Sequence, residues 1–216
     1  DGLSSSSYVN SYVIGQSLNI SKRFGFNGVN PATGVYTFID YDNNNQLGSP
    51  QDEQKIVDGS QFCFGGFQQN LVLGRFSVSC LIQFVRQPYA PNYLVWFSRP
   101  GSLSNQPVYV MNRWQKPGDQ SNNQRYSVSN AAANNAYGYY QCSDAGFSDA
   151  SYVRLRNLYI AFDVLTPSMK KIGINQANLF LQGHNLLTIT SYKGLDPETQ
   201  TFLPPVKLFT VGMEIN

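Results

Sequence analysis

Short segments in which apolar and polar residues alternate recur along this chain of 216 residues. At the C-terminus, residues 206–216 read VKLFTVGMEIN, with the bulky apolar side chains on one parity. Residues 76–84, FSVSCLIQF, repeat the pattern, and residues 152–165 follow it less well because Arg154 and Arg156 share the parity of Leu158. Side chains on a strand point to opposite faces in turn, so each segment predicts a β-strand with one apolar and one polar face.

About six strands are predicted, and their connections alternate in length. The predicted strands cover approximately residues 12–26, 61–69, 76–84, 152–165, 173–186 and 207–216. Short connections near 70–74 and 166–172 alternate with long ones at about 27–60, 86–150 and 187–204. Long unstructured connections are unusual in a compact soluble domain, whereas short turns alternating with long outer loops are typical of outer-membrane barrels. The sequence therefore predicts an all-β fold: about six antiparallel strands of a large transmembrane β-barrel with long extracellular loops.

In a barrel, the apolar parity of each strand faces lipid and the polar parity faces the lumen. The predicted lipid-facing residues are Phe76, Val78, Ile82, Phe84, Leu158, Ile160, Phe162, Phe209, Val211, Met213 and Ile215. The predicted lumen-facing residues are Ser77, Ser79, Gln83, Asp163 and Glu214. Strands of a β-sandwich alternate in the same way, so a soluble carbohydrate-binding β-sandwich remains the alternative.

Composition excludes several classes of protein. Charged residues make up only 13% of the chain, against roughly a quarter in a typical soluble domain. The net charge of +2 comes without clustered Lys and Arg, so nucleic acid is not an expected partner. No segment approaches the roughly 20 apolar residues of a membrane helix, and the first residues do not resemble a signal peptide.

No catalytic constellation is apparent, and the sequence predicts a protein that is not an enzyme. His184 is the only histidine, and it has no acidic neighbour in the sequence, so we expect a structural or lumen-facing role for it. The three cysteines fit no metal-binding spacing. Cys63 and Cys80 could face each other across a hairpin, either as a disulfide or as two small apolar residues in a sheet.

One acidic segment has the spacing of a calcium loop. Asp40, Asp42 and Asn44 occupy positions 1, 3 and 5 of such a loop. However, Asn45 stands where the loop needs glycine and Gln51 where it needs a bidentate glutamate. We therefore expect a solvated acidic turn and no cofactor, with calcium as a weak candidate.

Five stretches of sequence carry more information than periodicity. They are GVNPATGVYTFIDYD (28–42), FGGFQQNLVLGRFSVS (64–79), NRWQKPGD (112–119), SDASYVRLRNLYIAFDV (148–164) and GHNLLTITSYKGLDPE (183–198). Together they resemble the C-terminal part of the SusC/RagA family, the TonB-linked outer-membrane transporters of Bacteroidetes. The resemblance extends over nearly the whole chain.

The resemblance implies a 22-stranded barrel in the bacterial outer membrane, in contact with outer-membrane lipid. It also implies an N-terminal plug energised through TonB, a SusD-like surface lipoprotein as a lid, and import of oligosaccharides or peptides. Residues 1–216 would be the C-terminal part of that barrel, and the plug and the N-terminal barrel strands would be absent from this chain.

Two further groups of residues are candidates for contacts. In NRWQKPGD, the residues placed to touch substrate or the lid protein are Arg113, Trp114, Lys116 and Asp119; alternatively, an Arg–Asp pair around a buried Trp orders the loop. Aromatic residues that flank predicted strands could form an interfacial girdle, pack the loops or stack on sugars: Trp96, Phe97, Tyr137, Tyr139 and Tyr140. In KGLDPE (193–198), we expect a turn in which Asp196 bonds to nearby backbone.

Overall fold

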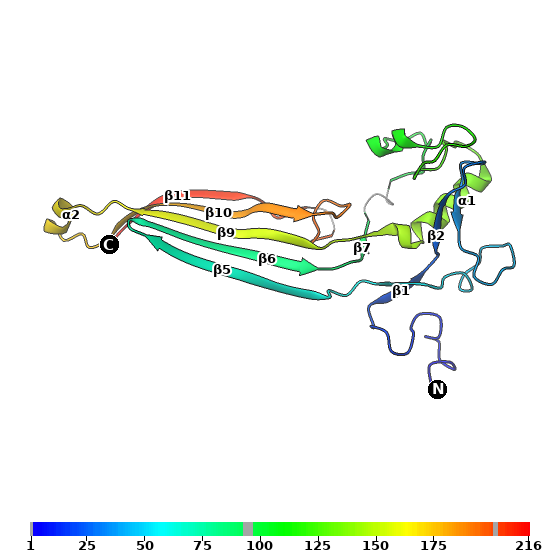
Figure 1. The fold of residues 1–216 in the computed structure, drawn as a ribbon, viewed down its shortest axis with the longest axis horizontal. Helices are drawn as coiled ribbons and strands as arrows, with labels where there is room; N and C mark the ends of the chain where they lie inside the picture. Colours follow the sequence, from blue (N-terminus) through cyan, green and yellow to red (C-terminus); the bar gives the residue numbers. More distant parts are fainter. Residues whose placement is uncertain (1, 93–96, 201–202) are drawn as a thin grey trace. The chain divides into compact units, whose positions relative to one another are not determined.

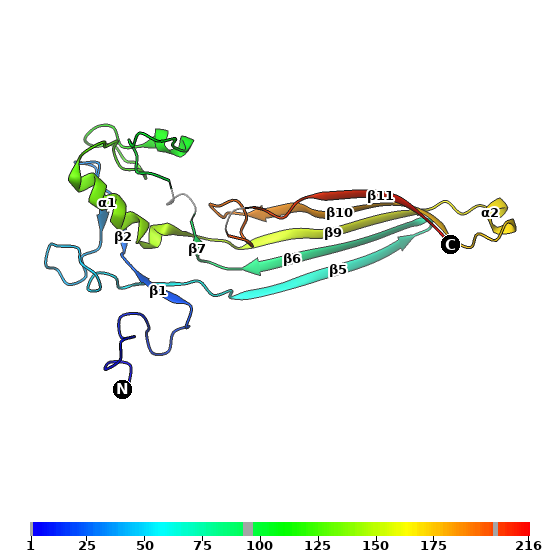
Figure 2. The same ribbon diagram turned by 180° about the vertical axis from the view of Figure 1, so that it is seen from behind.

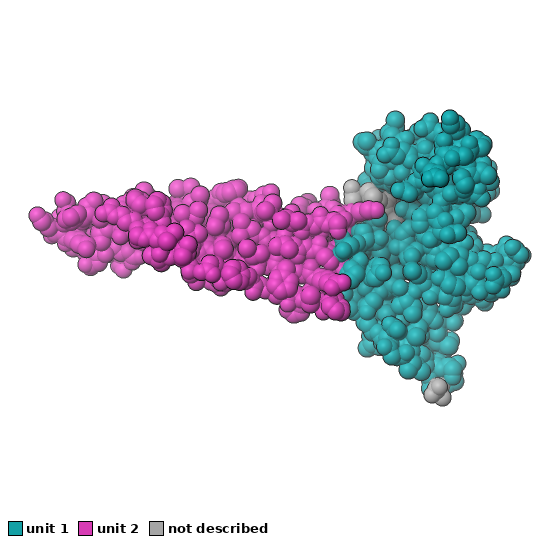
Figure 3. All heavy atoms as spheres, in the orientation of Figure 1, with its two compact units in different colours: residues 1–60, 88–149 teal, residues 61–87, 150–216 magenta. Residues whose placement is uncertain are grey.

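The chain forms two compact units (Figure 3). The computed structural model describes residues 2–92, 97–200 and 203–216, so Trp96 lies outside the described residues. Unit 1 comprises residues 1–60 and 88–149, and unit 2 comprises residues 61–87 and 150–216.

Unit 2 is built on one antiparallel sheet of five strands in the order β11-β10-β9-β6-β5 (Figure 1). The strands are β5 (Cys63–Leu73), β6 (Phe76–Arg86), β9 (Tyr152–Asp163), β10 (Ala177–Thr190) and β11 (Leu208–Ile215). They correspond to the last five of the six predicted strands. The C-terminus lies at the same end of the sheet as the short helix α2 (Pro167–Lys171).

The connections within unit 2 differ in length, but less sharply than predicted. Strands β5 and β6 are joined by Gly74 and Arg75 alone, and Gly74 has a φ of +61° at the first central position, as a type II′ turn requires. Strands β9 and β10 are joined by residues 164–176, which include α2 and are longer than the predicted break at 166–172. Strands β10 and β11 are joined at the opposite end by residues 191–207.

The strand register gives the sheet two chemically different faces. On one of them, Val78 of β6 lies opposite Ile160 of β9. Leu181 and Val211 continue this apolar row across β10 and β11. We call this the apolar face; all eleven residues predicted to face lipid lie on it. The opposite, polar face carries the five residues predicted to face the lumen.

The apolar face is uncovered within the described part of unit 2. Phe209 is 66% exposed and Val211 is 79% exposed. No second sheet of unit 2 packs on these side chains among the described residues. This arrangement does not support a β-sandwich, because a sandwich buries its apolar alternation between two sheets. Contact of these residues with lipid stays a prediction.

A β-bulge explains why the first half of β9 fits the alternation poorly. The pairing of β6 with β9 steps from Leu81–Asn157 directly to Ile82–Leu155, which leaves Arg156 as an extra residue. An inserted residue shifts the parity of every residue beyond it. Arg154 therefore lies on the polar face, although it shares the parity of Leu158.

The described residues of unit 1 form short elements only. Its strands are β1 (Ile20–Arg23), β2 (Phe26–Val29), β3 (Tyr36–Phe38), β4 (Lys55–Asp58), β7 (Ala90–Pro91) and β8 (Phe147–Ser148), which pair as β1–β4, β2–β3 and β7–β8. Its helices are α1 (Ala131–Gln141) and the 3-10 helices Val108–Asn112 and Asp144–Gly146. The view from behind in Figure 2 shows α1 beside β2.

The aromatic residues of α1 form the core of unit 1. Tyr36 and Tyr137 are buried with Ala136, and Phe26 and Tyr140 pack against them. The rings of Tyr36 and Tyr140 are stacked with their centroids 4.4 Å apart. Burial raises the pKa of Tyr36, so this hydroxyl stays neutral.

Two predictions about unit 1 are wrong. The strand predicted at 12–26 does not form, because residues 2–19 are largely turns and the rest divides between β1 and β2. The connection predicted to be structureless contains α1. The helix was not evident because Asn and Gly within AAANNAYGYYQ have poor helix propensity. Two features offset this low helix propensity. The tyrosines of α1 pack into the core of unit 1, and Asn130 caps the helix, with its Oδ1 accepting from the Ala133 N–H at 3.0 Å.

The register also decides the cysteine pairing. Cys63 lies opposite Arg86, and Cys80 lies opposite Gln69, so the two thiols do not face each other. All three cysteines are free. Helices within the described residues are all too short or too polar to span a bilayer.

Candidate functional site

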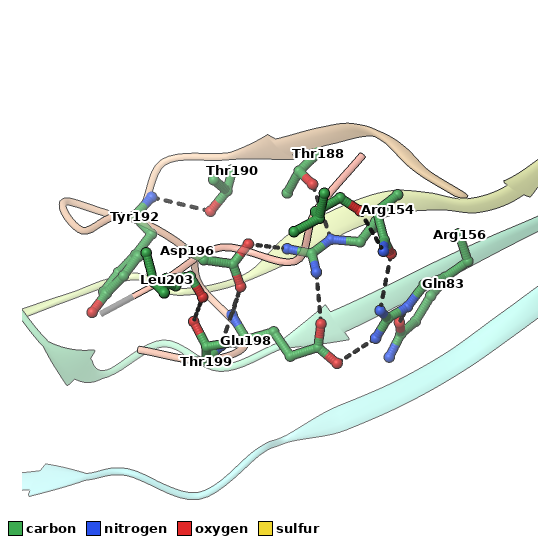
Figure 4. Close-up of polar contacts among 12 residues, drawn as sticks. Gln83, Arg154, Arg156, Thr188, Thr190, Tyr192, Asp196, Glu198, Thr199 and Leu203 are labelled. Atoms are coloured by element: carbon green, nitrogen blue, oxygen red, sulfur yellow. Dashed lines mark hydrogen bonds and ion pairs between the residues drawn. The ribbon is translucent and has the colours of Figure 1, made fainter. Parts of the chain in front are cut away.

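The polar face of unit 2 carries a network of ion pairs centred on Arg154 (Figure 4). The Arg154 side chain is 1% exposed. Its Nε donates to Thr188 Oγ1 at 2.9 Å, its Nη1 donates to Glu198 Oε2 at 2.6 Å, and its Nη2 pairs with Asp196. Every nitrogen of this buried guanidinium therefore has a partner.

Glu198 extends the network to a second arginine. One of its carboxylate oxygens accepts from Arg154 and the other from Arg156. Arg156, the extra residue of the β9 bulge, also donates to Gln83 and, at 3.3 Å, to Asn185 Oδ1. Two arginines thus meet two carboxylates, and the formal charges of the network balance.

Asp196 connects the network to the backbone of the connection between β10 and β11. Its Oδ1 accepts from the N–H groups of Glu198 at 3.0 Å and Thr199 at 3.1 Å, while its Oδ2 pairs with Arg154. The predicted turn role of Asp196 is confirmed. The sequence analysis did not predict this ion pair. Arg154 and Arg156, two charged residues at positions expected to be apolar in the strand predicted at 152–165, were the sign that acidic partners were needed.

A recess of about 490 Å³ lies beside this network on the polar face. Its lining residues are Gly66, Leu81, Gln83, Arg156, Asn157, His184 and Asn185. His184 lies on the polar face, opposite Asn157 of β9 and Leu208 of β11.

In unit 1, the NRWQKPGD segment is held against the residues around Pro31. Trp114 is buried, and its Nε1 donates to the Pro31 carbonyl at 2.9 Å. The Gly118 N–H donates to the same carbonyl at 2.8 Å. Gly34, with a φ of +69°, lies so close to the indole that a Cβ there would overlap the ring. The motif therefore orders this part of unit 1.

The predicted Arg–Asp pair does not form between these described residues. The Arg113 guanidinium lies 3.6 Å from the centroid of the Tyr126 ring. Asp119 Oδ2 instead accepts from the N–H groups of Gln115 and Lys116, both at 3.0 Å. Lys116 is exposed. Contact of these residues with substrate or a lid protein stays a prediction.

The acidic segment of unit 1 differs from the predicted calcium loop. Carboxylate oxygens of Asp40, Asp42 and Asp52 lie within 4.8 Å of one another, whereas Asn44 uses its Nδ2 to donate to Asp42 at 2.8 Å. Oxygen ligands of this kind suit Ca²⁺. The expectation of a solvated acidic turn, with calcium as a weak candidate, stays a prediction; the carboxylate that joins Asp40 and Asp42 is that of Asp52, and Asn44 is not part of the group.

Asp52 is buried and bonded to the backbone. Its oxygens accept from the Gly48 N–H at 2.8 Å and the Tyr41 N–H at 2.7 Å. These N–H donors, Gly48 first, hold the pKa of the Asp52 carboxyl below its usual range.

The tyrosines of α1 pack within unit 1. The Tyr137 hydroxyl donates to the Phe97 carbonyl at 2.6 Å, and the Tyr139 hydroxyl donates to the Leu47 carbonyl at 3.1 Å. Of the three roles considered for these aromatic residues, the structure shows loop packing.

The chain is similar in sequence to a protein of known family. The chain is 28% identical over 165 residues to TonB-dependent receptor P3 of Formosa agariphila. The match covers 76% of this chain and 15% of that receptor. No family model matches the chain.

Solved structures match over most of the chain. The RagAB peptide importer in its open-open state gives a TM-score of 0.70 at 18% identity. The RagAB peptide transporter gives 0.71 at 21%, and the closed-closed importer gives 0.70 at 19%. Each match covers 89% of this chain and 22% of the other. The chain therefore spans less than a quarter of the length of the proteins that it matches.

Proposed function

We propose that this chain, a barrel segment of the SusC/RagA-like type, forms part of the wall and mouth of a TonB-dependent importer. Its location is the bacterial outer membrane, and its work is transport rather than enzymatic catalysis. The observation that carries the proposal is the strand register of unit 2. It sets an exposed apolar face against a polar face, which is the arrangement that a barrel wall needs between lipid and a wet lumen.

The two edges of the sheet support a larger barrel. Among the described residues, strands β5 and β11 each pair with a single neighbouring strand. Unpaired backbone groups at an open edge are not tolerated in hydrocarbon, so both strands need further partners in the membrane. We propose that these partners complete a 22-stranded barrel around a plug that TonB energises.

Unit 1 supplies the mouth in this proposal. It consists of the segments that precede β5 and that connect β6 to β9. Long connections of outer-membrane barrels are extracellular, so unit 1 would meet cargo and a SusD-like lipoprotein lid there. Lys116, exposed on the ordered NRWQKPGD segment, is the first residue to test for such a contact.

The cargo would be an oligosaccharide or a peptide fragment. The matched structures are those of a peptide importer and a peptide transporter. Because this chain covers only 22% of their length, their cargo does not decide between a sugar and a peptide here. The substrate therefore has to be determined on the complete transporter.

The proposal is tested by uptake into cells that express the complete protein. We expect accumulation of fluorescent oligosaccharides or peptides that stops when an uncoupler collapses the proton gradient, and co-purification of a surface lipoprotein. A strain lacking TonB is the matched control. Uptake that is insensitive to both treatments would indicate a passive pore and overturn the proposal.

A further inference from the structure

A second pocket, of about 690 Å³, lies within unit 1 and shares no residue with the recess of unit 2. Its walls come from residues 32–37, from the NRWQKPGD segment, from Arg125 and from the start of α1. All of these residues belong to unit 1, so one compact unit forms the whole pocket. A volume of this size is in the range that holds a small ligand.

Hydrogen bonds hold the walls of this pocket in place. The Arg125 N–H donates to the Gly34 carbonyl at 2.8 Å. The Trp114 indole is buried against Gly34 and donates to the Pro31 carbonyl at 2.9 Å. The backbone N–H of Trp114 donates to the Asn123 carbonyl, also at 2.9 Å. The pocket is therefore preformed, and a ligand does not have to order its walls on binding.

Arg125 brings an unpaired positive charge to the pocket. Its side chain is half-buried, yet its guanidinium has no hydrogen bond, ion pair or ring contact with any described residue. Among the described residues, a buried nitrogen without a partner occurs at Arg23 Nε and not at Arg125. The nitrogens of Arg125 are therefore open to a ligand.

The surroundings of Arg125 supply no negative charge to neutralise it. The charged residues of the segment 87–143 are Arg99, Arg113, Lys116, Asp119 and Arg125, a net charge of 4 − 1 = +3. The Asp119 carboxylate accepts from two backbone N–H groups of its own segment. Arg99 donates to two backbone carbonyls and Arg113 lies over an aromatic ring, so both are already engaged. No acidic side chain is among the described residues that line the pocket.

The rest of the lining suits the fragment that carries an acidic group. Val35, Trp114 and Pro117 give apolar surface, and Thr33 gives a hydroxyl. Ala132 lies in the first turn of α1, at the positive end of the helix dipole, which adds to the positive potential. A guanidinium binds a carboxylate through two parallel N–H···O bonds, a geometry that no neutral group reproduces.

We propose that this pocket of unit 1 binds a carboxylate group of the cargo, and that Arg125 is the residue that pairs with it. This deepens the proposed transport function and rests on it. The carboxylate is the same chemical group on an acidic peptide and on a sugar that contains uronic acid, and the probes below separate these two sources.

The test uses the complete transporter purified in detergent without its lipoprotein. Saturation-transfer NMR detects binding within pools of probes, and titration of the best binder gives its Kd. One pool contains short oligomers of galacturonic, glucuronic and mannuronic acid, with their methyl esters as the neutral counterpart. The other contains short capped peptides with one glutamate or aspartate, with the corresponding glutamine or asparagine peptides as the neutral counterpart.

Three variants change the charge of the pocket or its bulk. Arg125→Gln removes the guanidinium. Ala132→Glu places a carboxylate at the pocket, in the first helical turn, where an acidic side chain is also favourable for the helix. Ala132→Gln adds the same bulk without the charge. The matched control is Arg75→Gln, the same substitution at the exposed turn between β5 and β6.

We expect one carboxylate pool to bind and its neutral counterpart to bind much more weakly. Arg125→Gln should weaken binding about ten- to a hundredfold, the value of a hydrogen-bonded charge. Ala132→Glu should weaken it at least as much, Ala132→Gln should cost less, and Arg75→Gln should leave the Kd unchanged. Thermal unfolding shows which variants fold, and Ala132→Glu keeps the proposal testable if Arg125→Gln does not.

Three results would overturn the site. The first is binding of neither carboxylate pool, and the second is equal binding of the charged and neutral probes. The third is an equal loss in Ala132→Glu and Ala132→Gln, because bulk and not charge would then be responsible. If Arg125→Gln weakens only the association with the lipoprotein, the occupant is the lid protein, and the assignment to cargo is wrong.

These outcomes are distinct from failure of the transport proposal. Uptake that persists in uncoupled cells would contradict gated import, whereas titration of the purified protein still decides whether the pocket binds a carboxylate.

Discussion

Arg154 and Asp196 form a buried ion pair across 42 positions of sequence. The arginine comes from a strand in the middle of the sheet, and the aspartate comes from the connection between β10 and β11. The pair joins SYVRLRN to KGLDPE, two of the sequence motifs that carry the family resemblance. It fixes the start of that connection to the polar face of the sheet.

Removal of Asp196 should therefore release this connection. Asp196→Ala leaves the buried Arg154 with Glu198 as its one carboxylate partner, and it removes the acceptor of two backbone N–H groups. Breaking a buried pair costs about 3–5 kcal/mol. We expect a loss of that order in the free energy of opening of residues 191–200, measured by hydrogen exchange on the complete transporter.

Two further variants distinguish loss of the Arg154–Asp196 ion pair from a general loss of stability. Glu198→Gln should cost less, because the Glu198 side chain is one-third exposed. The double variant Arg154→Met with Asp196→Leu should lose less than the sum of the single changes, because it removes both charges. Additive losses would mean that the two residues are not coupled.

The two faces of β11 should respond differently to a new charge. Val211 lies on the apolar face and Glu214 lies on the polar face of the same strand. Lysine at a lipid-facing midplane position costs about 2–4 kcal/mol. We expect Val211→Lys to lower the folding stability of the complete protein in lipid by this amount and Glu214→Lys to have a much smaller effect. Equal losses would contradict the assignment of the faces.

The packing of the Trp114 indole should require a glycine at position 34. Gly34 and Gly28 both have positive φ, at +69° and +86°, but a Cβ at Gly28 would meet nothing within 4 Å. Alanine in the left-handed region costs about 1–2 kcal/mol. Gly28→Ala should show this cost alone, whereas Gly34→Ala should also displace the indole.

Limited proteolysis around residues 112–125 and Trp fluorescence report that displacement. Equal sensitivity of the two alanine variants would mean that Trp114 does not depend on the absence of a side chain at position 34.

The backbone amides that donate to Asp52 should lose protection from hydrogen exchange at acidic pH. The N–H donors lower its folded pKa below the ordinary value of about 3.9. A lowered folded pKa means that the stabilising contribution is complete above the unfolded pKa and disappears as the pH falls through the folded value. Exchange of the amides of Tyr41 and Gly48 should accelerate over that acidic range. Asp52→Asn should remove the pH dependence of exchange at these two amides. If the pH profile of that variant is unchanged, a group other than Asp52 causes the dependence.

The regular strands were the part of the fold that the sequence allowed us to predict. In β6 and β11 the alternation is unbroken, so parity alone places Phe76 and Val211 on the same face. In β9 the inserted Arg156 breaks the parity, and only the pairing with β6 reveals it.

The site depended on contacts that are distant in sequence. Asp196 was predictable as a turn residue because its backbone partners are two and three positions away. Its pairing with Arg154 follows from the register of three strands. Likewise, Asp52 replaces Asn44 in the acidic cluster because the chain folds back, which a spacing rule for consecutive ligands does not anticipate.

With Cys63, which is also exposed, replaced by serine, the two remaining thiols of this chain report the depth of the sheet. Cys80 lies mid-strand in β6 on the apolar face, whereas Cys142 is exposed in unit 1. A membrane-impermeant maleimide applied to intact cells should modify Cys142 and spare Cys80 until detergent strips the acyl chains away. Prompt labelling of Cys80 in the native membrane would place that surface in water.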